Sequence, residues 1–356
     1  MSKLSDTLTQ AWYSNTRKWV WVLLPLSALF FLISRIRILI YKLGLKSAYR
    51  PSISVVVVGN ISVGGNGKTP VVIALVEHLQ SKGIRCAVLS RGYGGAQMDF
   101  PFMLPTAKES SASPLYENAS VAKLSGDEPT LISQRTKVPV VIDPVRARGA
   151  KFIEEHTDAQ VIVCDDGMQH YALARDIELC VMDGRGVGNG FLLPMGPLRE
   201  TSARLSKVDY IVLNASQTTL LPVLKPYEDK LNLMRLAPQS YVNVQSGERL
   251  ALEQAHALFA QAKSISAVAG IGDPNRFFAA LKEQGLTLAS CHPLPDHHQI
   301  SKADMPATDI ILMTEKDAVK CSEFANQKMW YLQVTAVIDG KCFDEIEKRL
   351  RKRLTT

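Results

Sequence analysis

The residues with the clearest chemical meaning form a glycine-rich stretch that ends in Gly67, Lys68 and Thr69. Glycine, lysine and a hydroxyl residue in this order close a phosphate-binding loop. In such a loop the backbone N–H groups converge on phosphate oxygens, the lysine reaches the outer phosphates, and the hydroxyl ligates Mg²⁺. The residues expected to hold the phosphates are Ser62, Val63, Gly64, Gly65, Asn66, Gly67, Lys68 and Thr69. The stretch therefore predicts binding of a nucleoside triphosphate together with Mg²⁺.

The sequence on either side of this loop predicts the elements that hold it. Residues 55–58 are consecutive valines, which is typical of a buried parallel strand. After the loop, apolar residues recur at helical spacing from Val71 to Leu79. Ser62 stands where the general pattern has glycine, so one alternative is an ordinary glycine-rich turn that caps a helix. A strand before the loop and a helix after it favour the phosphate loop.

Two acidic residues end another apolar run. Residues 160–164 read as a strand, and Asp165 and Asp166 follow it before Gly167. A carboxylate at the end of such a strand faces the phosphate loop and its metal in phosphate-loop enzymes, although Asp-Asp-Gly is also common in surface turns. Further along, a glycine- and proline-rich stretch leads to Arg199 and Glu200. This composition indicates a shaped, functional loop.

From Val208 the alternation of strands and helices starts again. Strands are expected near residues 210–213, 264–269 and 310–313, and helices near residues 250–259, 274–283 and 316–324. The predicted fold class is therefore α/β. It comprises a phosphate-loop NTPase-like core with a mostly parallel sheet, a second, smaller α/β domain and an N-terminal membrane-anchoring helix. The expected boundaries are residues 1–50 for the anchor, 51–207 for the core and 208–356 for the smaller domain.

The N-terminal segment is apolar with basic margins. Residues 19–34 carry no charge, Arg17 and Lys18 precede them, and several arginines and lysines follow. As a helix this run would span roughly 24 Å, less than a hydrocarbon core of about 30 Å. We therefore expect an interfacial or shallowly inserted anchor on an anionic leaflet. A cleaved signal peptide and a buried core helix are the alternatives.

Composition narrows the class of protein further. The chain has 356 residues, of which 46% are hydrophobic, so it can form two domains. Its formal net charge of +7 suits an anionic partner. The six cysteines show no C-x-x-C spacing, which predicts reduced core thiols in a cytosolic compartment. A basic run at residues 349–353 leaves nucleic-acid binding open, but such a run is more often a solvated helix face.

Taken together, these motifs resemble the tetraacyldisaccharide 4'-kinase family, the membrane-bound kinases of lipid A biosynthesis in Gram-negative bacteria. The resemblance covers most of the chain. It rests on stretches that occur in the family's order: Gly59-Asn60, Gly64 to Pro70, Ser90-Arg91-Gly92-Tyr93-Gly94, Gly126-Asp127-Glu128-Pro129, Asp165-Asp166-Gly167 with Gln169-His170, Gly196 to Glu200, Asp296-His297-His298 and Thr314-Glu315-Lys316-Asp317.

The resemblance implies a reaction. The family transfers the γ-phosphate of ATP to the 4'-hydroxyl of a tetraacylated glucosamine disaccharide 1-phosphate, which gives lipid IVA. It also implies a monomer at the cytoplasmic face of the inner membrane, with this acylated lipid and the anionic membrane surface as partners and no nucleic acid. A second α/β domain that closes over the nucleotide is implied likewise.

Roles for single residues follow from the same resemblance. Lys68, Asp127 and His297 correspond to the family's catalytic residues, with Asp127 as the base at the sugar hydroxyl and His297 as its partner. The groups around Mg²⁺ correspond to Thr69, Asp165, Asp166 and Glu200. A histidine pair can also be a metal site or part of a surface loop, but no third ligand stands at recognisable spacing.

A membrane-tethered phosphate-loop NTPase switch is the alternative function. Such a switch would share the phosphate loop, but it should carry a base-specificity motif such as Asn-Lys-x-Asp. The nearest stretch is Thr314-Glu315-Lys316-Asp317, in which Glu315 does not fit that motif. The sequence therefore favours the kinase.

Overall fold

A computed structural model gives the structure of the chain and describes residues 3–14, 18–97, 99–105, 121–215, 221–296 and 298–354. The chain forms two compact units, each built from separate stretches of sequence. The phosphate-loop unit comprises Met1–Arg91, Val138–Arg235 and Ala336–Thr356, and the second unit comprises Gly92–Lys137 and Leu236–Thr335. The sequence-derived boundaries at residues 50 and 207 stay a prediction.

The sheet of the phosphate-loop unit is parallel. Its strands are β1 (Ser54–Gly59), β2 (Cys86–Ser90), β4 (Val140–Ile142), β5 (Val161–Asp165), β6 (Ile177–Asp183), β7 (Tyr210–Asn214) and the start of β8 (Leu231–Asn243). They lie in the order β8-β7-β6-β1-β5-β2-β4, and each neighbouring pair is parallel. All of β1 and β5 is buried, as their apolar runs predict. The predicted parallel core is confirmed.

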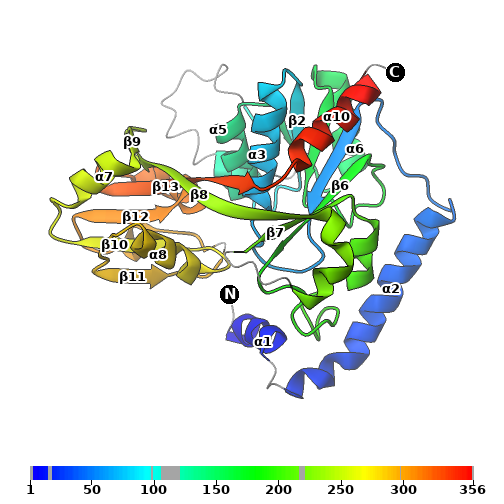
Figure 1. Cartoon of the computed structure of the whole chain (residues 1–356), viewed down its shortest axis with the longest axis horizontal. Coiled ribbons are helices and arrows are strands. Elements are labelled where there is room, and N and C mark those ends of the chain that lie inside the picture. Colours follow the sequence, from blue (N-terminus) through cyan, green and yellow to red (C-terminus); the bar gives the residue numbers. More distant parts are fainter. Residues whose placement is uncertain are drawn as a thin grey trace. The chain divides into compact units, whose positions relative to one another are not determined.

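Helices cover this sheet (Figure 1). The helix α3 (Lys68–Ser81) packs against β1, β2 and β5, and α6 (Arg146–His156) packs against β2 and β4. The C-terminal helix α10 (Cys342–Leu354) lies beside α3. Short 3₁₀ helices, η2 (Ser202–Lys207) and η3 (Pro222–Lys230), flank β7 along the chain. The face of α3 that contacts the sheet is apolar. Packing of this face orients the helix and thereby its first residue, Lys68, which follows the loop.

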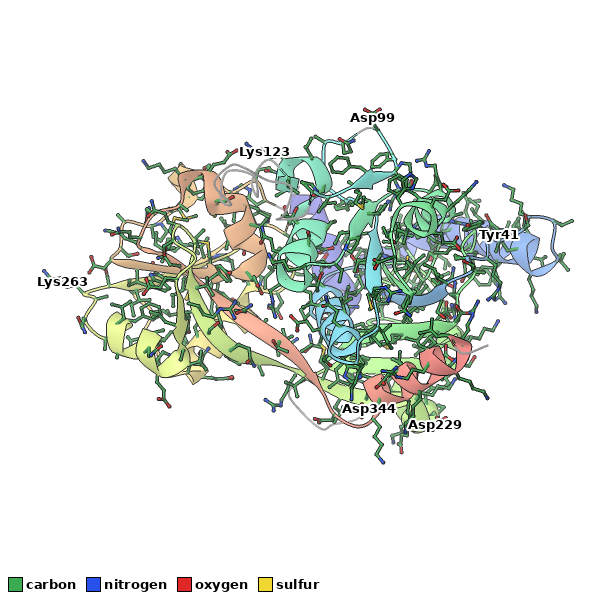
Figure 2. The ribbon with its side chains drawn as sticks, turned by 90° about the horizontal axis from the view of Figure 1, so that it is seen from above. Tyr41, Asp99, Lys123, Asp229, Lys263 and Asp344 are labelled. Carbon is green, nitrogen blue, oxygen red and sulfur yellow. The ribbon has the colours of Figure 1, made fainter. Side chains whose placement is uncertain are left out.

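The N-terminal segment contains α1 (Lys3–Tyr13), η1 (Lys18–Leu23) and α2 (Leu24–Lys42). Together η1 and α2 give a helical run from Trp19 to Lys42 that has a mean hydropathy of 2.0 over its best window, and 6% of that window is buried. By length and composition it is able to cross a membrane. The helix is longer than the uncharged run suggested, because it continues through Arg35 and Arg37 to Lys42. Tyr41, near its end, is labelled in Figure 2. Its exposed apolar side chains do not fit the buried core helix that was the alternative.

In the second unit, β11 (Ser290–Pro293), β10 (Ile265–Ala269), β12 (Ile310–Thr314) and β13 (Met329–Ile338) are parallel neighbours in that order. The remaining elements are β3 (Phe102–Met103), α5 (Asp127–Thr136), β9 (Arg249–Ala251), α7 (Leu252–Phe259), α8 (Pro274–Glu283), η4 (Lys302–Asp304), α9 (Glu315–Cys321) and η5 (Ser322–Phe324). Its core includes Tyr241, Phe259 and Trp330. The predicted alternation of strands and helices is confirmed.

Cysteine placement agrees in part with the expected core thiols. All six cysteines are free and five are buried, whereas Cys291 is exposed on β11. Burial raises the pKa of Cys86 and Cys180 to about 12. These thiols therefore stay protonated at neutral pH and fill the core as small apolar side chains.

Candidate active site

Close packing explains the glycines of the phosphate loop. Gly67 has a φ of +89°, and a Cβ placed there would lie 2.7 Å from the Asn214 side-chain nitrogen. At the end of β1, a Cβ on Gly59 would lie 2.7 Å from the Met168 side chain. A side chain at Gly67 would strain the backbone and displace Asn214, and a side chain at Gly59 would displace Met168. Ser62, at the usual glycine position, forms a bridge with Leu198 and is buried.

Lys68 and Asp166 form the charged centre of this loop. Asp166 directly follows β5, and its carboxylate lies 3.6 Å from Lys68 Nζ and 2.9 Å from Arg199 Nη1. Burial would raise the pKa of Asp166, but the charges of Lys68 and Arg199 outweigh that effect and lower its pKa to about 2. Asp166 is therefore ionised at every physiological pH, and the lysine of the loop has a fixed counter-charge.

Asp165 lies beside the same loop because of strand register. It pairs with Val58 across β1 and β5, just before the loop begins. Its buried carboxylate accepts a hydrogen bond of 3.2 Å from Ser90 Oγ. Arg146, which is 1% exposed, donates to the main-chain oxygens of Asp165 and Asp143 at 3.0 and 2.7 Å. Arg146 therefore holds the backbone of this strand end in place.

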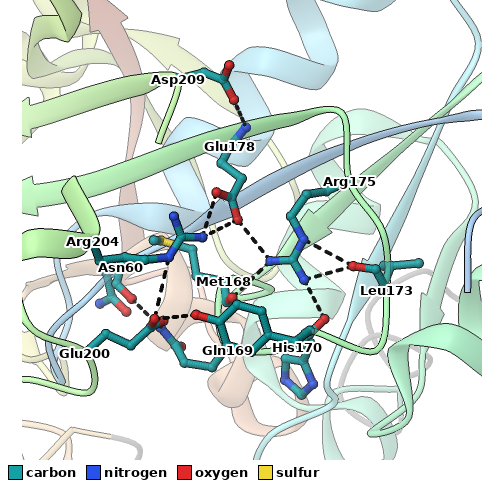
Figure 3. A network of polar contacts seen from close by, with 11 residues as sticks. Asn60, Met168, Gln169, His170, Leu173, Arg175, Glu178, Glu200, Arg204 and Asp209 are labelled. Carbon is teal, nitrogen blue, oxygen red and sulfur yellow. Dashed lines mark hydrogen bonds and ion pairs between the residues drawn. The ribbon is translucent and has the colours of Figure 1, made fainter. Parts of the chain in front are cut away.

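Glu200 is part of a buried polar network (Figure 3). Gln169 Nε2 donates to Glu200 at 2.8 Å and to the main-chain oxygen of Asn60 at 3.1 Å. Tyr171 also donates to Glu200, and Arg204 Nε lies 3.5 Å from its carboxylate. These contacts engage both carboxylate oxygens, so Glu200 positions the chain around the loop.

The network extends to residues that sequence reasoning did not single out. Arg204 and Arg175 share Glu178, with Arg204 Nη2 at 2.5 Å from Oε1 and Arg175 Nη1 at 3.0 Å from the same oxygen. All three side chains are nearly buried. Arg175 and Glu178 are three positions apart, in the turn before β6 and in β6, and Arg204 lies 26 positions after Glu178 in η2. Only the packed structure brings them together.

A pocket of about 340 Å³ lies between α2 and this network. On the α2 side it is lined by Phe31, Arg35 and Ile38. The opposite wall carries basic side chains together with Glu200, among them Arg175, Arg199, Arg204 and Lys207. The pocket therefore offers apolar surface on a membrane-seeking helix and positive charge on the core.

The second unit contains an ionic cluster around Asp127. This residue begins α5, and its carboxylate lies 3.4 Å from Lys320 Nζ. Lys320 is 5% exposed and also lies 3.3 Å from Asp317. Asp317 in turn accepts a hydrogen bond of 2.9 Å from the Gly270 amide. Lys320 therefore fixes the position of Asp127, and the sequence analysis did not identify it.

Lys316 forms the second half of this cluster. Its Nζ lies 3.2 Å from Glu128 and 3.3 Å from Asp296. Burial would lower the pKa of Lys316, but Glu128, Asp296 and Asp127 outweigh burial and raise its pKa to about 12. Lys316 and Lys320 stand four positions apart in α9, a spacing that places two side chains on one helix face. That spacing was the available sequence signal for both lysines.

The stretch that most resembled a base-specificity motif has a structural use. Thr314 Oγ1 caps α9 by accepting from the Asp317 amide. Glu315 receives two hydrogen bonds from Arg135 Nη1, at 2.9 and 3.1 Å. Each of these side chains therefore already has a partner within the second unit.

The histidine pair is described only in part. His297 lies outside the described residues, so its proposed contact with Asp127 stays a prediction. His298 Nε2 lies 3.5 Å from Asp304. His298 lies in the loop before η4, and this contact joins it to the last residue of η4.

Two sets of residues have ligand atoms suited to a metal. Thr69, Asp165 and Asp166 supply only oxygens at the phosphate loop, and oxygen is the ligand that Mg²⁺ takes. The described residues also include His78 on α3 and Asp344 and Glu347 on α10, whose ligand atoms lie within 4.8 Å of one another. Asp344 is labelled in Figure 2. Glu347 is already paired with Lys82 and Arg351, and we interpret this second set as an ion-pair cluster that joins the two helices.

Comparison with known proteins gives consistent matches. The family model described as tetraacyldisaccharide-1-P 4'-kinase matches residues 19–352. The tetraacyldisaccharide 4'-kinase of Pseudoalteromonas atlantica is 45% identical over 330 residues, which cover 92% of this chain and 99% of that protein. The crystal structure of LpxK from Aquifex aeolicus in complex with ATP superposes with a TM-score of 0.75 at 25% identity, covering 94% of this chain and 99% of that one.

Proposed function

The chain belongs to the tetraacyldisaccharide-1-P 4'-kinase family, and we propose that it carries out that family's reaction with the residues described above. The enzyme is an ATP-dependent kinase of lipid A biosynthesis that phosphorylates the 4'-hydroxyl of its lipid acceptor. In this transfer the bond between the γ-phosphorus and the bridging oxygen of ATP breaks, a bond from the hydroxyl oxygen to phosphorus forms, and the hydroxyl proton passes to a base.

The loop at the end of β1 is our assignment for the ATP phosphates. Lys68 carries the positive charge of this loop. Its Nζ lies 3.6 Å from the Asp166 carboxylate, and a bound phosphate would share this positive charge with Asp166. Thr69, Asp165 and Asp166 are the residues we assign to Mg²⁺, since they offer the oxygen atoms this ion prefers. When bound, Mg²⁺ would neutralise charge on the β- and γ-phosphates. We assign Glu200 a supporting role in the metal site, because Gln169, Tyr171 and Arg204 already contact its carboxylate.

Asp127 is our assignment for the base that accepts the hydroxyl proton. Its carboxylate is held by Lys320 in a cluster where carboxylates outnumber lysines. Excess negative charge favours proton uptake, and the ion pair fixes the geometry that a base needs. His297 is proposed as the partner of Asp127 on the strength of family resemblance.

The pocket beside α2 supports an acceptor that is partly apolar and partly anionic. Phe31 and Ile38 offer contact to acyl chains, while Arg35, Arg175 and Lys207 offer positive charge to a phosphate. The helical run from Trp19 to Lys42 would hold the enzyme at the leaflet that contains the lipid. Since ATP is cytosolic, we place the enzyme at the cytoplasmic face of the inner membrane.

The single observation that carries this proposal is the contact between Lys68, which begins α3 after the loop, and Asp166, which follows β5, within a chain of this family. The test is to measure ATP consumption by the full-length protein with and without an acylated disaccharide 1-phosphate. We expect ATP to be consumed only with the acceptor, and one phosphate to appear on the lipid for each ATP used. A membrane-tethered NTPase switch would hydrolyse ATP without the lipid, and that result would refute the kinase assignment.

A further inference from the structure

The N-terminal helix α1 is attached to the loop between β6 and η2. Trp12 Nε1 donates to the Pro194 oxygen at 3.0 Å, and the Asn189 amide donates to the Trp12 oxygen at 2.8 Å. Ala11 is 1% exposed and packs with Met195 in a small apolar cluster. Helix α1 is therefore part of the folded phosphate-loop unit, with polar and apolar contacts that are independent of any membrane.

The same loop is hydrogen-bonded to the phosphate loop. The Val63 amide donates to the Pro197 oxygen at 2.9 Å, and the Arg199 amide donates to the Ile61 oxygen at 2.7 Å. These bonds come from the backbone on both sides of Leu198, which itself bridges to Ser62. One segment of chain thus contacts α1 at one end and the phosphate loop at the other.

Arg185 connects the two regions directly. Its Nη2 lies 2.6 Å from Asp183 and 3.1 Å from the Asn66 side-chain oxygen. Its guanidinium lies over the ring of Tyr13, the last residue of α1, at 5.1 Å from the ring centre. A Cβ built on Gly64 would lie 3.4 Å from Nη2, so the guanidinium also lies against the loop backbone.

Asn66 shows what this contact does. Its side chain is 2% exposed, and its Nδ2 donates to Ser62 Oγ at 3.0 Å across the loop. Arginine can only donate hydrogen bonds, so the Asn66 oxygen must face Arg185 and its nitrogen must face Ser62. Arg185 therefore sets the orientation of the Asn66 amide, and that amide joins the first and last parts of the phosphate loop.

We propose that Arg185 is a positioning residue for the phosphate loop and that Tyr13 of α1 holds it there, so that ATP affinity depends on the N-terminal helix. The inference rests on the proposed binding of ATP at this loop. Asp183 neutralises the guanidinium, and Tyr13 covers one of its faces. Without Tyr13, Arg185 keeps its contacts with Asp183 and Asn66 but loses the ring that covers one face of its guanidinium, so it is held less firmly over the loop.

The test measures equilibrium binding of a fluorescent ATP analogue with Mg²⁺ to the full-length protein in detergent, without lipid acceptor. We expect Arg185→Ala to weaken binding about tenfold, because a hydrogen bond from a charged group is lost. Tyr13→Ala should weaken it about two- to fivefold, the range of a partly exposed cation–π contact. Tyr13→Phe keeps the ring and should restore nearly full affinity. Gln10→Ala, an exposed change on the same helix, is the matched control and should bind normally.

The double variant Tyr13→Ala with Arg185→Ala makes the coupling measurable. It should bind no more weakly than Arg185→Ala alone, because the tyrosine acts through the arginine. In turnover with the lipid, both single variants should raise the KM for ATP and leave kcat nearly unchanged. Sedimentation of Tyr13→Ala with vesicles should match that of the wild type, which separates this effect from membrane anchoring.

Several outcomes would overturn the inference. They are normal ATP affinity in Tyr13→Ala, multiplied effects in the double variant, or an equal loss in Tyr13→Phe. Lys68→Ala serves as the reference for the phosphate loop itself. If Lys68→Ala loses affinity while the Tyr13 and Arg185 variants keep it, the inference fails and the proposed function stands. If Lys68→Ala binds ATP normally, the assignment of the loop fails.

Discussion

Two aspartates, one in each unit, contact a lysine at similar distance but have opposite surroundings. Asp166 lies 3.6 Å from Lys68 and shares its charge with Arg199, so cations outnumber carboxylates there. Asp127 lies 3.4 Å from Lys320, which it shares with Asp317, so carboxylates predominate. The first arrangement favours an incoming phosphate, and the second favours uptake of a proton. The surrounding charge therefore distinguishes the carboxylate beside the proposed phosphate site from the proposed base.

The largest expected effect is at Asp127. Asp127→Asn should lower kcat by about 10²–10⁴-fold, the usual contribution of a general base, with the KM for ATP nearly unchanged. Steady-state kinetics with the lipid acceptor measure this. Combining Asp127→Ala with His297→Ala should cost far less than the product of the single effects, since residues that act as a unit are non-additive.

The matched control for this prediction is Glu323→Gln, which alters an exposed carboxylate of the same unit. It should leave kcat unchanged, because exposed ion pairs contribute little. If the effects of Asp127→Ala and His297→Ala multiply in the double variant, His297 is not the partner of Asp127. A larger loss in His298→Ala than in His297→Ala would assign the role to the second histidine.

Lys68→Ala should have the next largest effect. It removes a charge that acts on the developing charge of the transition state, and we expect a loss of about 10²–10³-fold in kcat. The same lipid kinase assay measures it, and circular dichroism should show an unchanged fold. Lys82→Ala, at the exposed end of α3, provides the control and should retain activity. Near-normal turnover in Lys68→Ala would show that the positive charge beside Asp166 does not serve phosphate transfer, which contradicts the comparison with Asp127.

Lys320→Met sharpens the comparison at smaller magnitude. The change leaves Asp127 and Asp317 without their shared cation, so the pKa of Asp127 should rise and kcat should fall by about tenfold at neutral pH. The pH profile of kcat should shift to higher pH, which a purely structural defect would not produce. Lys123→Met removes an exposed pair with Glu323 and should change neither quantity. An unshifted profile in Lys320→Met would show that this lysine does not tune the base.

The smallest expected effect is the pH dependence of stability at His170. Burial, with Arg146, Arg91 and Arg37, lowers the pKa of His170 to about 3, against an ordinary value of 6.5. The unfolded chain therefore binds the proton first, so stability falls as pH drops from about 6.5 toward 3. His170→Gln should flatten the pH dependence of the free energy of unfolding over this window, as measured by urea denaturation. An unchanged slope would show that His170 is protonated in the folded state.

Local pattern was sufficient for much of the fold. The consecutive valines of β1 favour a strand that is buried on both faces of a sheet. The apolar residues after Thr69 recur at the spacing of an α-helix, and this region forms α3. The register of β1 with β5 brings Asp165 beside Val58, and it does not follow from burial, because every residue of both strands is buried. By contrast, β8 was missed. It runs from Leu231 to Asn243 with mixed burial and contains Pro238, so no clean alternation marks it.

The candidate site divides in the same way. The sequence by itself determined the phosphate loop, with Lys68 and Thr69 at its end, because backbone geometry requires those residue types at that spacing. Only the tertiary structure decided that Lys320 holds Asp127, that Glu178 joins Arg175 to Arg204, and that Tyr13 covers Arg185. Apart from Arg175 with Glu178, which are three positions apart, these pairs join residues that are distant along the chain. Ion pairs and ring contacts depend on the distance between residues in space. Packing of the core sets that distance, so it cannot be read from the sequence alone.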